Sequence, residues 1–178
     1  MIFEAEHFHI NGLVLIKPKI FGDERGYFFE SYAKKDLESI GIECAFIQDN
    51  QAHSSKGVLR GLHFQKDPYA QAKLVRVTQG RVYDVALDIR HGSPTYGQYA
   101  AVELSDTNHH IFFIPKGFAH GYLVLSESAM FQYKCDAYYH PAAEGGIRYD
   151  DPSLSIPWPR LDVPYQVSAK DLSLTLFK

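Results

Sequence analysis

Cysteine is scarce in this chain, long apolar runs are missing, and no block of basic residues stands out. The two cysteines, Cys44 and Cys135, form no CxxC pair, which predicts free thiols in a reducing cytoplasm rather than a disulfide framework. The first residues include early acidic side chains and no long apolar run, so we expect neither a signal peptide nor a membrane span. The net charge of −3 argues against a nucleic-acid-binding surface.

The composition is that of a globular chain with a substantial core. Of the 178 residues, 46% are hydrophobic and 22% are charged, and this length suits one domain. No repeat, low-complexity tract or linker interrupts the sequence. We therefore expect a single domain over residues 1–178.

Short β-type runs separated by turn residues dominate the chain. They are rich in Val, Ile, Phe and Tyr, which favour a pleated, half-buried surface. Many short strands at nearly regular spacing predict a sandwich or a barrel, which can enclose one ligand. Residues 33–40 and a short segment near Ser168 look helical, and the proline-rich residues 151–159 should wrap the surface. The expected strands are 13–17, 26–32, 45–48, 58–64, 73–78, 81–89, 99–104, 110–114, 121–125 and 129–135.

The segment from Gly57 to Gln65 carries the strongest chemical signal. Arg60 and His63 lie there among Val, Leu and Phe. Burying a polar group unpaired costs about 2–7 kcal/mol, and a charge costs more, so internal partners or a ligand-filled cavity must compensate. The rest of the chain favours the cavity. Three positions apart, the two side chains would point oppositely from a regular strand, unless Gly61 hosts a bulge that re-aims one of them.

Two other strands each carry one polar side chain among apolar neighbours. Lys73 shares a strand face with Val75, and Tyr133 shares one with Phe131. Taken alone, such a lysine usually lies at a strand edge or on the surface. Such a tyrosine is usually a core residue with one hydrogen bond, so neither residue indicates a function by itself.

A histidine pattern raises the question of a metal. Pro115 to His120 reads PxGxxH, the second half of the motif with which cupin-type double-stranded β-helix proteins often bind a metal. The first half is broken, because Gln65 follows His63 where a second histidine should stand, and the expected carboxylate is missing. Two histidines without a third ligand make a poor site. We therefore expect the cupin shape with acid–base side chains and no metal.

Taken in order, the motifs resemble those of one family, the dTDP-4-dehydrorhamnose 3,5-epimerases. Each motif is weak by itself, but the ordered set is specific and covers most of the chain. The matching segments are residues 23–30, 48–50, 57–65, 71–77, 84–90, 93–97, 114–121, 133–135, 138–141, 151–152, 158–159 and 168–171.

The resemblance implies a fold and a reaction. The fold is an all-β cupin jelly roll (a double-stranded β-helix) with a few short peripheral helices, usually assembled as a homodimer. The reaction inverts C3 and C5 of dTDP-4-dehydro-6-deoxy-D-glucose to give dTDP-4-dehydro-L-rhamnose, on the pathway to dTDP-L-rhamnose. Neither a cofactor nor a metal takes part.

The resemblance also implies roles for individual residues. His63 matches the catalytic base, Asp171 its carboxylate partner, Tyr133 the acid on the opposite ring face, and Lys73 the group at the sugar's O4. From the sequence alone, the spacing of Ser168 and Asp171 favours a helix-capping pattern, and it is the resemblance that gives Asp171 the catalytic role. The positions that match substrate contacts are Arg25, Glu30, Gln48, Asn50, Arg60, His120, Tyr139, Glu144 and Lys170, of which Arg25 and Glu30 are expected to reach the neighbouring subunit's site.

These residue types suit proton transfer beside a ketone. A C–H next to a carbonyl is a weak acid whose anion is an enolate, so inversion needs a base, a group that holds the enolate oxygen, and an acid on the opposite face. Histidine is the usual base near neutral pH, and a carboxylate on its other ring nitrogen fixes the tautomer. An ammonium stabilises the negative charge that develops on the oxygen.

Two alternatives to the 3,5-epimerase remain open. One is a relative that inverts a single carbon or acts on another nucleotide-linked 4-keto sugar. The other is a catalytically silent cupin that only binds a nucleotide sugar. The joint presence of His63, Asp171, Tyr133 and Lys73 argues against the silent protein, because binding alone needs neither a base nor an acid.

Overall fold

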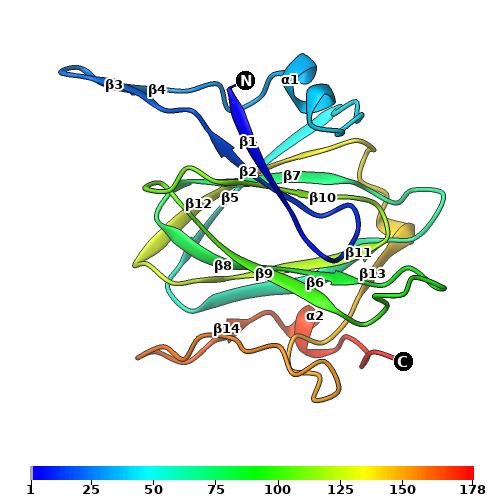
Figure 1. The fold of residues 1–178 in the computed structure, drawn as a ribbon. Helices are drawn as coiled ribbons and strands as arrows, with labels where there is room; N and C mark the ends of the chain where they lie inside the picture. Colours follow the sequence, from blue (N-terminus) through cyan, green and yellow to red (C-terminus); the bar gives the residue numbers. More distant parts are fainter. Residues whose placement is uncertain (1) are drawn as a thin grey trace.

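Two β-sheets face each other and enclose the core in the computed structural model, which describes residues 2–178 (Figure 1). The first sheet holds, in spatial order, β1 (Phe3–His7), β2 (Val14–Pro18), β10 (Ile111–Ile114), β7 (Lys73–Gln79), β12 (Ser128–Cys135) and β5 (Gln48–Ser55). The second holds β13 (Glu144–Gly146), β6 (Val58–Gln65), β11 (Phe118–Val124), β8 (Arg81–Asp88) and β9 (Tyr99–Ser105), with β14 (Gln166–Val167) parallel to β6. Strands distant in the sequence are neighbours in both sheets.

The space between the sheets is filled by residues that recur at every second strand position. Val75 and Val77 of β7, Ala86 of β8 and Phe131 of β12 belong to this inner core, and each is at most 3% exposed. The two-residue period of a strand sends the intervening side chains to the opposite face. The sequence pattern therefore decides which side chains can line a cavity between the sheets.

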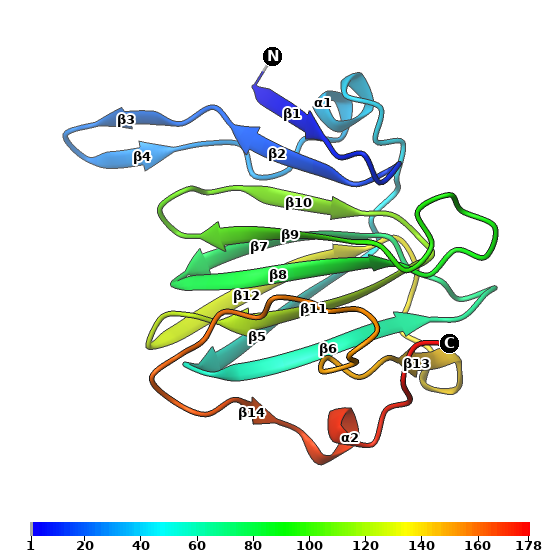
Figure 2. The same ribbon diagram turned by 60° about the horizontal axis from the view of Figure 1, so that its bottom comes forward.

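Separate apolar layers cover the outer faces of the two sheets. Helix α1 (Lys34–Ser39) packs Leu37 into one buried cluster with Ile16 and Leu74 of the first sheet. The C-terminal segment places Leu154 in a cluster with Val85 and Leu87 of the second sheet, over which it runs in Figure 2. Covering both faces leaves the edges of the sheets as the way into the interior.

The remaining helices are short. They are the 3-10 turn η1 (Pro141–Ala143) and α2 (Ala169–Leu172), which lies under β6 in Figure 2. No helix in the described part of the chain is long and apolar enough to cross a membrane. Both predicted helices are confirmed: the first spans Lys34–Ser39, and Ser168 is the N-cap of the second.

A two-stranded arm projects from the body. It consists of β3 (Phe21–Asp23) and β4 (Gly26–Phe28) and extends beyond both sheets in Figures 1 and 2. Tyr27 and Phe28 are 60% and 64% exposed on it. The arm therefore presents aromatic surface that the body of the same chain does not cover.

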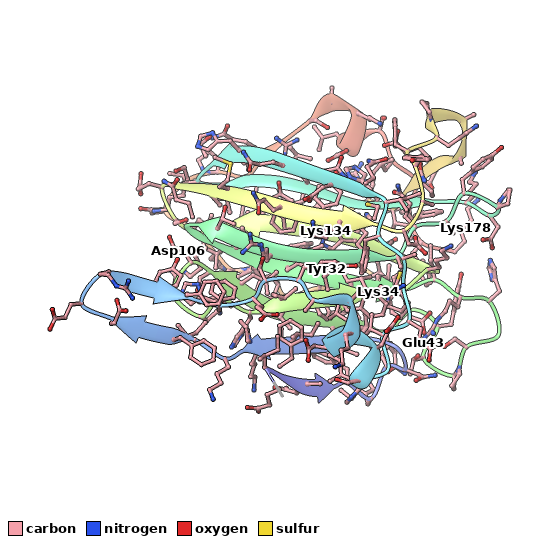
Figure 3. All side chains as sticks on the ribbon, turned by 90° about the horizontal axis from the view of Figure 1, so that it is seen from above. Tyr32, Lys34, Glu43, Asp106, Lys134 and Lys178 are labelled. Atoms are coloured by element: carbon pink, nitrogen blue, oxygen red, sulfur yellow. The ribbon has the colours of Figure 1, made fainter. Side chains whose placement is uncertain are left out.

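The arm contacts the body through one of its aromatic side chains. The ring of His109 packs on Tyr27 with the ring centroids 4.7 Å apart. Further along the chain, Lys134 Nζ lies 5.4 Å from the centre of the Tyr32 ring, and both residues are labelled side by side in Figure 3. The arm is thus in contact with the body at Tyr27, while the Arg25 side chain at its tip is 89% exposed.

The structure confirms the predicted all-β sandwich and corrects two strands. The expected strand 26–32 ends at Phe28, and the expected strand 45–48 contains only the first residue of β5. The pattern missed β5 because residues 48–55 are almost all polar. This strand forms by pairing along its whole length with β12, from Gln48 opposite Cys135 to Ser55 opposite Ser128. The sequence pattern also missed β1, β3, β13 and β14, which are short or lie at sheet edges.

Candidate active site

A cavity of about 180 Å³ lies between the two sheets and gathers most of the predicted chemical groups. Its walls come from β5, β6, β7, β11 and β12. The lining residues are Ala52, Arg60, His63, Lys73, His120, Gly121, Tyr122, Phe131 and Tyr133.

Arg60 and His63 reach this cavity together because β6 bulges between them. His63 pairs with His120, and Arg60 pairs with Tyr122, so three steps along β6 match two steps along β11. The extra residue on β6 returns both side chains to the same face of the sheet. The bulge therefore removes the parity conflict that the sequence left open.

Glycine is required at position 61, where β6 lies close to the backbone of Gly121 on β11. Gly61 has a φ of +129°, and a Cβ there would lie 2.5 Å from the Gly121 Cα. We expect Gly61→Ala to lower the free energy of unfolding by about 2–4 kcal/mol, since the obstructing atoms are backbone and cannot yield. Gly92→Ala is the matched control: its φ is +85°, but a Cβ there would meet nothing within 4 Å. Its expected cost is about 1 kcal/mol. Guanidinium denaturation at one protein concentration measures both, and equal losses would contradict the packing argument.

His63 and Asp171, which are 108 positions apart, form a close pair. His63 Nε2 lies 2.7 Å from Asp171 Oδ1. Asp171 is 3% exposed, and its Oδ2 accepts the backbone N–H of Gly61 at 3.2 Å. In the neutral imidazole, Nε2–H donates to the carboxylate and Nδ1 remains to accept a proton. This is the arrangement in which a buried carboxylate orients a histidine base.

Asp171 serves the capping pattern and the histidine pair at once. Its backbone N–H donates to Ser168 Oγ at 3.0 Å, so the predicted helix cap is present. Its side chain points away from the cap toward His63. The two interpretations of this residue are therefore compatible, because the cap uses the main chain and leaves the carboxylate free.

Lys73 and Tyr133 line the cavity from neighbouring strands of the first sheet. Burial lowers the pKa of Lys73 and raises the pKa of Tyr133. Both shifts favour the neutral form, because a low-dielectric surrounding disfavours charge. Tyr133 therefore keeps its proton at neutral pH and can act as a donor.

A second histidine–carboxylate pair lies next to the first, because His120 of β11 is opposite His63 of β6. His120 Nε2 is 2.9 Å from Asp84 Oδ2, and the two residues are 6% and 0% exposed. Burial lowers the pKa of His120, and the Asp84 carboxylate opposes that effect. Asp84 was not among the predicted site residues. Its signal in the sequence is an acidic residue in the apolar run 82–87, in phase with Ala86 on the inner face.

Five predicted substrate contacts form a hydrogen-bonded rim beside the cavity. Gln48 accepts the Tyr139 N–H at 3.0 Å and donates to Asn50 at 3.0 Å. Glu144 accepts the Tyr139 hydroxyl at 2.8 Å and the Lys170 ammonium at 2.6 Å. The hydrogen bond from Lys170 lowers the pKa of Glu144, so this carboxylate is ionised at neutral pH. Because β13 pairs with β6 around His63, the rim borders the cavity.

Arg25 and Glu30 are not part of this chain's cavity. The Arg25 side chain is 89% exposed at the tip of the arm and forms an ion pair with Asp23. Glu30 is exposed just beyond β4. Within one chain, the structure therefore does not bring these two residues to the other predicted contacts.

Both cavity histidines use one ring nitrogen to contact a carboxylate. His63 and His120 each direct Nε2 to a carboxylate, Asp171 and Asp84 respectively. Within residues 2–178, no three His, Cys, Asp or Glu side chains gather in a way that could hold a metal ion. Each histidine thus has a hydrogen-bonding role that the structure accounts for.

A larger hollow of about 790 Å³ lies elsewhere, against the C-terminal residues. Phe64, Arg90, Lys116 and Phe177 are among its walls, and Arg90 is already engaged by Asp88 at 2.7 Å. The smaller cavity holds the histidine–carboxylate pairs and the groups with shifted pKa values. Such clusters mark functional sites better than volume does.

Comparison with known proteins shows which family this chain resembles. The sequence model of the dTDP-4-dehydrorhamnose 3,5-epimerases matches residues 7–178. The dTDP-4-dehydrorhamnose 3,5-epimerase of Salmonella typhimurium is 50% identical over 168 residues, which are 94% of this chain and 91% of that protein.

Solved structures agree with the sequence match. The 3,5-epimerase of Legionella pneumophila, in complex with dTDP-4-keto-L-rhamnose, has a TM-score of 0.94 and 51% identity, covering 98% of this chain and 92% of that chain. The dTDP-4-dehydrorhamnose 3,5-epimerase of Elizabethkingia anophelis has a TM-score of 0.94 and 44% identity, covering 99% and 97%. The predicted cupin jelly roll is confirmed, and this chain belongs to the dTDP-4-dehydrorhamnose 3,5-epimerase family.

Proposed function

We propose that this protein epimerises dTDP-4-dehydro-6-deoxy-D-glucose at C3 and C5, giving dTDP-4-dehydro-L-rhamnose for dTDP-L-rhamnose biosynthesis. The observation that carries this conclusion is the His63–Asp171 pair facing a cavity that also contains Lys73 and Tyr133. Family membership supports the same reaction, since the relatives at about half identity are named as 3,5-epimerases.

His63 acts as the base in this proposal. Asp171 holds the Nε2–H tautomer, so Nδ1 takes the proton from the carbon beside the ketone. As the imidazolium forms, the buried carboxylate at 2.7 Å stabilises its charge. The pair therefore favours the charged state that proton abstraction creates.

Lys73 and Tyr133 complete the proton transfer. Lys73 donates to the carbonyl oxygen and stabilises the enolate charge, which is worth more in a desolvated cavity than in water. Tyr133, whose pKa burial raises, supplies a proton from the first sheet, across the cavity from His63 on the second. Abstraction from one side and delivery from the other invert the carbon. The chemistry is a proton exchange that changes no oxidation state, so we propose that it needs no cofactor.

The two basic side chains of the cavity, Lys73 and Arg60, fit the two ends of the substrate's hexose. Lys73 pairs with Cys135 at one end of β12, whereas Arg60 Nε donates to Ser54, which pairs with Ala129 toward the other end. In a 4-keto sugar nucleotide, the ketone and the C1 diphosphate lie on opposite sides of the ring. Lys73 therefore meets the ketone oxygen, and the Arg60 guanidinium meets the diphosphate.

Deuterium exchange tests the proposed function. The protein is incubated with dTDP-4-dehydro-6-deoxy-D-glucose in D₂O, and label is read at each carbon by NMR. We expect deuterium at both C3 and C5 of the product. Label at C3 alone would identify a single-carbon epimerase, preference for a GDP or CDP sugar would identify a different substrate, and no exchange at either carbon would reject the proposal.

We also propose that the active unit is a homodimer in which the arm of one chain completes the site of the other. The cavity, at about 180 Å³, is smaller than the roughly 300–1,000 Å³ of typical ligand pockets and can take the sugar but not the whole nucleotide. The exposed aromatic side chains of the arm need a cover, and a second copy supplies one. Arg25 and Glu30 would then contact the nucleotide in the partner's site.

Subunit complementation tests this arrangement. Arg25→Ala and His63→Asn are each expected to be strongly impaired. In a mixed dimer, one site keeps its own His63 and receives the intact Arg25 from the other chain. Unfolding and refolding the two variants together should restore about a quarter of wild-type activity, since half of random dimers are mixed and each has one working site. No recovery in dimers shown to be mixed would place Arg25 in its own chain's site.

We place the reaction in the cytoplasm. The support comes from the cysteines, because Cys44 and Cys135 are free thiols in the structure, as the sequence predicted. Free thiols are typical of reducing compartments.

A further inference from the structure

The hydroxyl of Tyr122 is buried at the wall of the cavity without a hydrogen-bond partner among residues 2–178. Tyr122 is 5% exposed, and its ring stacks on Phe131 with centroids 4.1 Å apart and an interplanar angle of 11°, which fixes the direction of the phenol. Buried polar groups nearly always find a partner, because their lost hydration is otherwise uncompensated. Phenylalanine would fill the same space without this penalty, so the hydroxyl needs a functional reason.

Arg60 is the charged group beside this hydroxyl. Arg60 and Tyr122 are opposite each other in the register of β6 and β11. Arg60 Nε donates to the Oγ of Ser54, which is 5% exposed, at 3.1 Å. Burial raises the pKa of Tyr122, and the neighbouring Ser54 hydroxyl and Arg60 guanidinium oppose that rise. Ser54, Tyr122 and the guanidinium thus form one polar cluster at the edge of the cavity.

Ser54 and Tyr122 can accept hydrogen bonds from different N–H groups of Arg60. A guanidinium has five N–H groups in a fixed plane and no acceptor. Ser54 engages Nε from β5, and the Tyr122 oxygen lies on β11, so it can accept only from a terminal nitrogen. Because Ser54 and Tyr122 belong to different sheets, hydrogen bonds to both would fix the plane of the Arg60 guanidinium, which one hydrogen bond cannot do.

We propose that Ser54 and Tyr122 are positioning residues that hold the Arg60 guanidinium for the substrate's diphosphate, Ser54 accepting from Nε and Tyr122 from a terminal N–H once Arg60 turns to the ligand. The inference rests on the proposed function, in which Arg60 binds the diphosphate. The remaining N–H groups then meet the phosphate oxygens as a planar fork. In the loaded site the Tyr122 hydroxyl then accepts a full hydrogen bond from Arg60.

The variants Tyr122→Phe and Ser54→Ala test whether these two residues position Arg60. We expect each to raise KM about 5- to 30-fold with kcat within about twofold, because one hydrogen bond to a charged group is lost while the acid–base groups stay in place. Calorimetry should show a similar loss of affinity for dTDP, which carries the diphosphate but no sugar. Tyr99→Phe is the control: its hydroxyl donates to Ser155 O at 3.4 Å outside the cavity, and its KM should not change.

Two further measurements separate positioning from other roles. Ligand-free Tyr122→Phe should have a Tm no lower than that of the wild type, because it loses an unpaired buried hydroxyl; a marked fall would show a structural role and overturn the proposal. In an Arg60→Ala background, Tyr122→Phe should cause no further loss of dTDP affinity, whereas a full additional loss would show a contact independent of Arg60 and would also overturn it. An unchanged KM in both single variants would reject the positioning of Arg60 by Ser54 and Tyr122. Absence of turnover in the wild-type protein would instead contradict the proposed function.

Discussion

Replacing His63 with asparagine is expected to lower kcat for epimerisation by about 10³- to 10⁴-fold, the usual worth of a general base held by a carboxylate. Asparagine is the smaller polar side chain, and Asp171 Oδ2 still accepts the backbone N–H of Gly61 at 3.2 Å, so the buried carboxylate keeps a partner and the fold should be retained. The amide cannot take a proton from carbon. The measurement is the rate of product formation, with deuterium uptake from D₂O at C3 and C5 followed in the same sample.

His53→Asn is the matched control for this variant. His53 follows the lining residue Ala52 on β5, but its side chain is exposed on the opposite, outward face of the strand, so its replacement should leave kcat unchanged. In His63→Asn, exchange should disappear at both carbons together with turnover, while dTDP still binds. Continued exchange at either carbon would show that another group removes that proton, and the role given to His63 would then be wrong for that step.

Replacing Tyr133 with phenylalanine is expected to lower the rate of net inversion by about 10²- to 10⁴-fold while leaving proton abstraction in place. The base on the second sheet remains, so it can remove a proton and return one to the same face. We therefore expect recovered substrate to carry deuterium without inversion. NMR of the unreacted sugar nucleotide, read against the rate of product formation, separates the two events.

The control for the tyrosine variant is Tyr138→Phe. Tyr138 is 69% exposed and outside the cavity walls, so its loss should change neither exchange nor inversion. If Tyr133→Phe lost exchange and inversion together, the phenol would be needed for abstraction itself. If both continued at the wild-type rate, water or another side chain would deliver the second proton.

The apolar strands could be predicted from the sequence because their signal is local. Runs such as residues 73–78 and 129–135 contain β-branched and aromatic residues in a two-residue period, and the observed β7 and β12 overlap them. The cap at Ser168 was visible for the same reason, since a cap needs only residues within one turn. Strand β5 was missed because its half-buried side carries Gln48 and Asn50 at the site, where function replaces apolar residues with polar ones.

The sequence by itself determined the all-β class, the free thiols and the identity of most chemical groups, because composition, period and motif order are properties of neighbouring residues. Only the tertiary structure decided that Arg60 and His63 face one cavity, through a bulge that depends on the close crossing of Gly61 and Gly121. It also decided that Asp171 meets His63 and that the Tyr122 hydroxyl lies unpaired beside Arg60. Those contacts join strands far apart in the chain, so their geometry depends on how the two sheets pack and not on any local pattern.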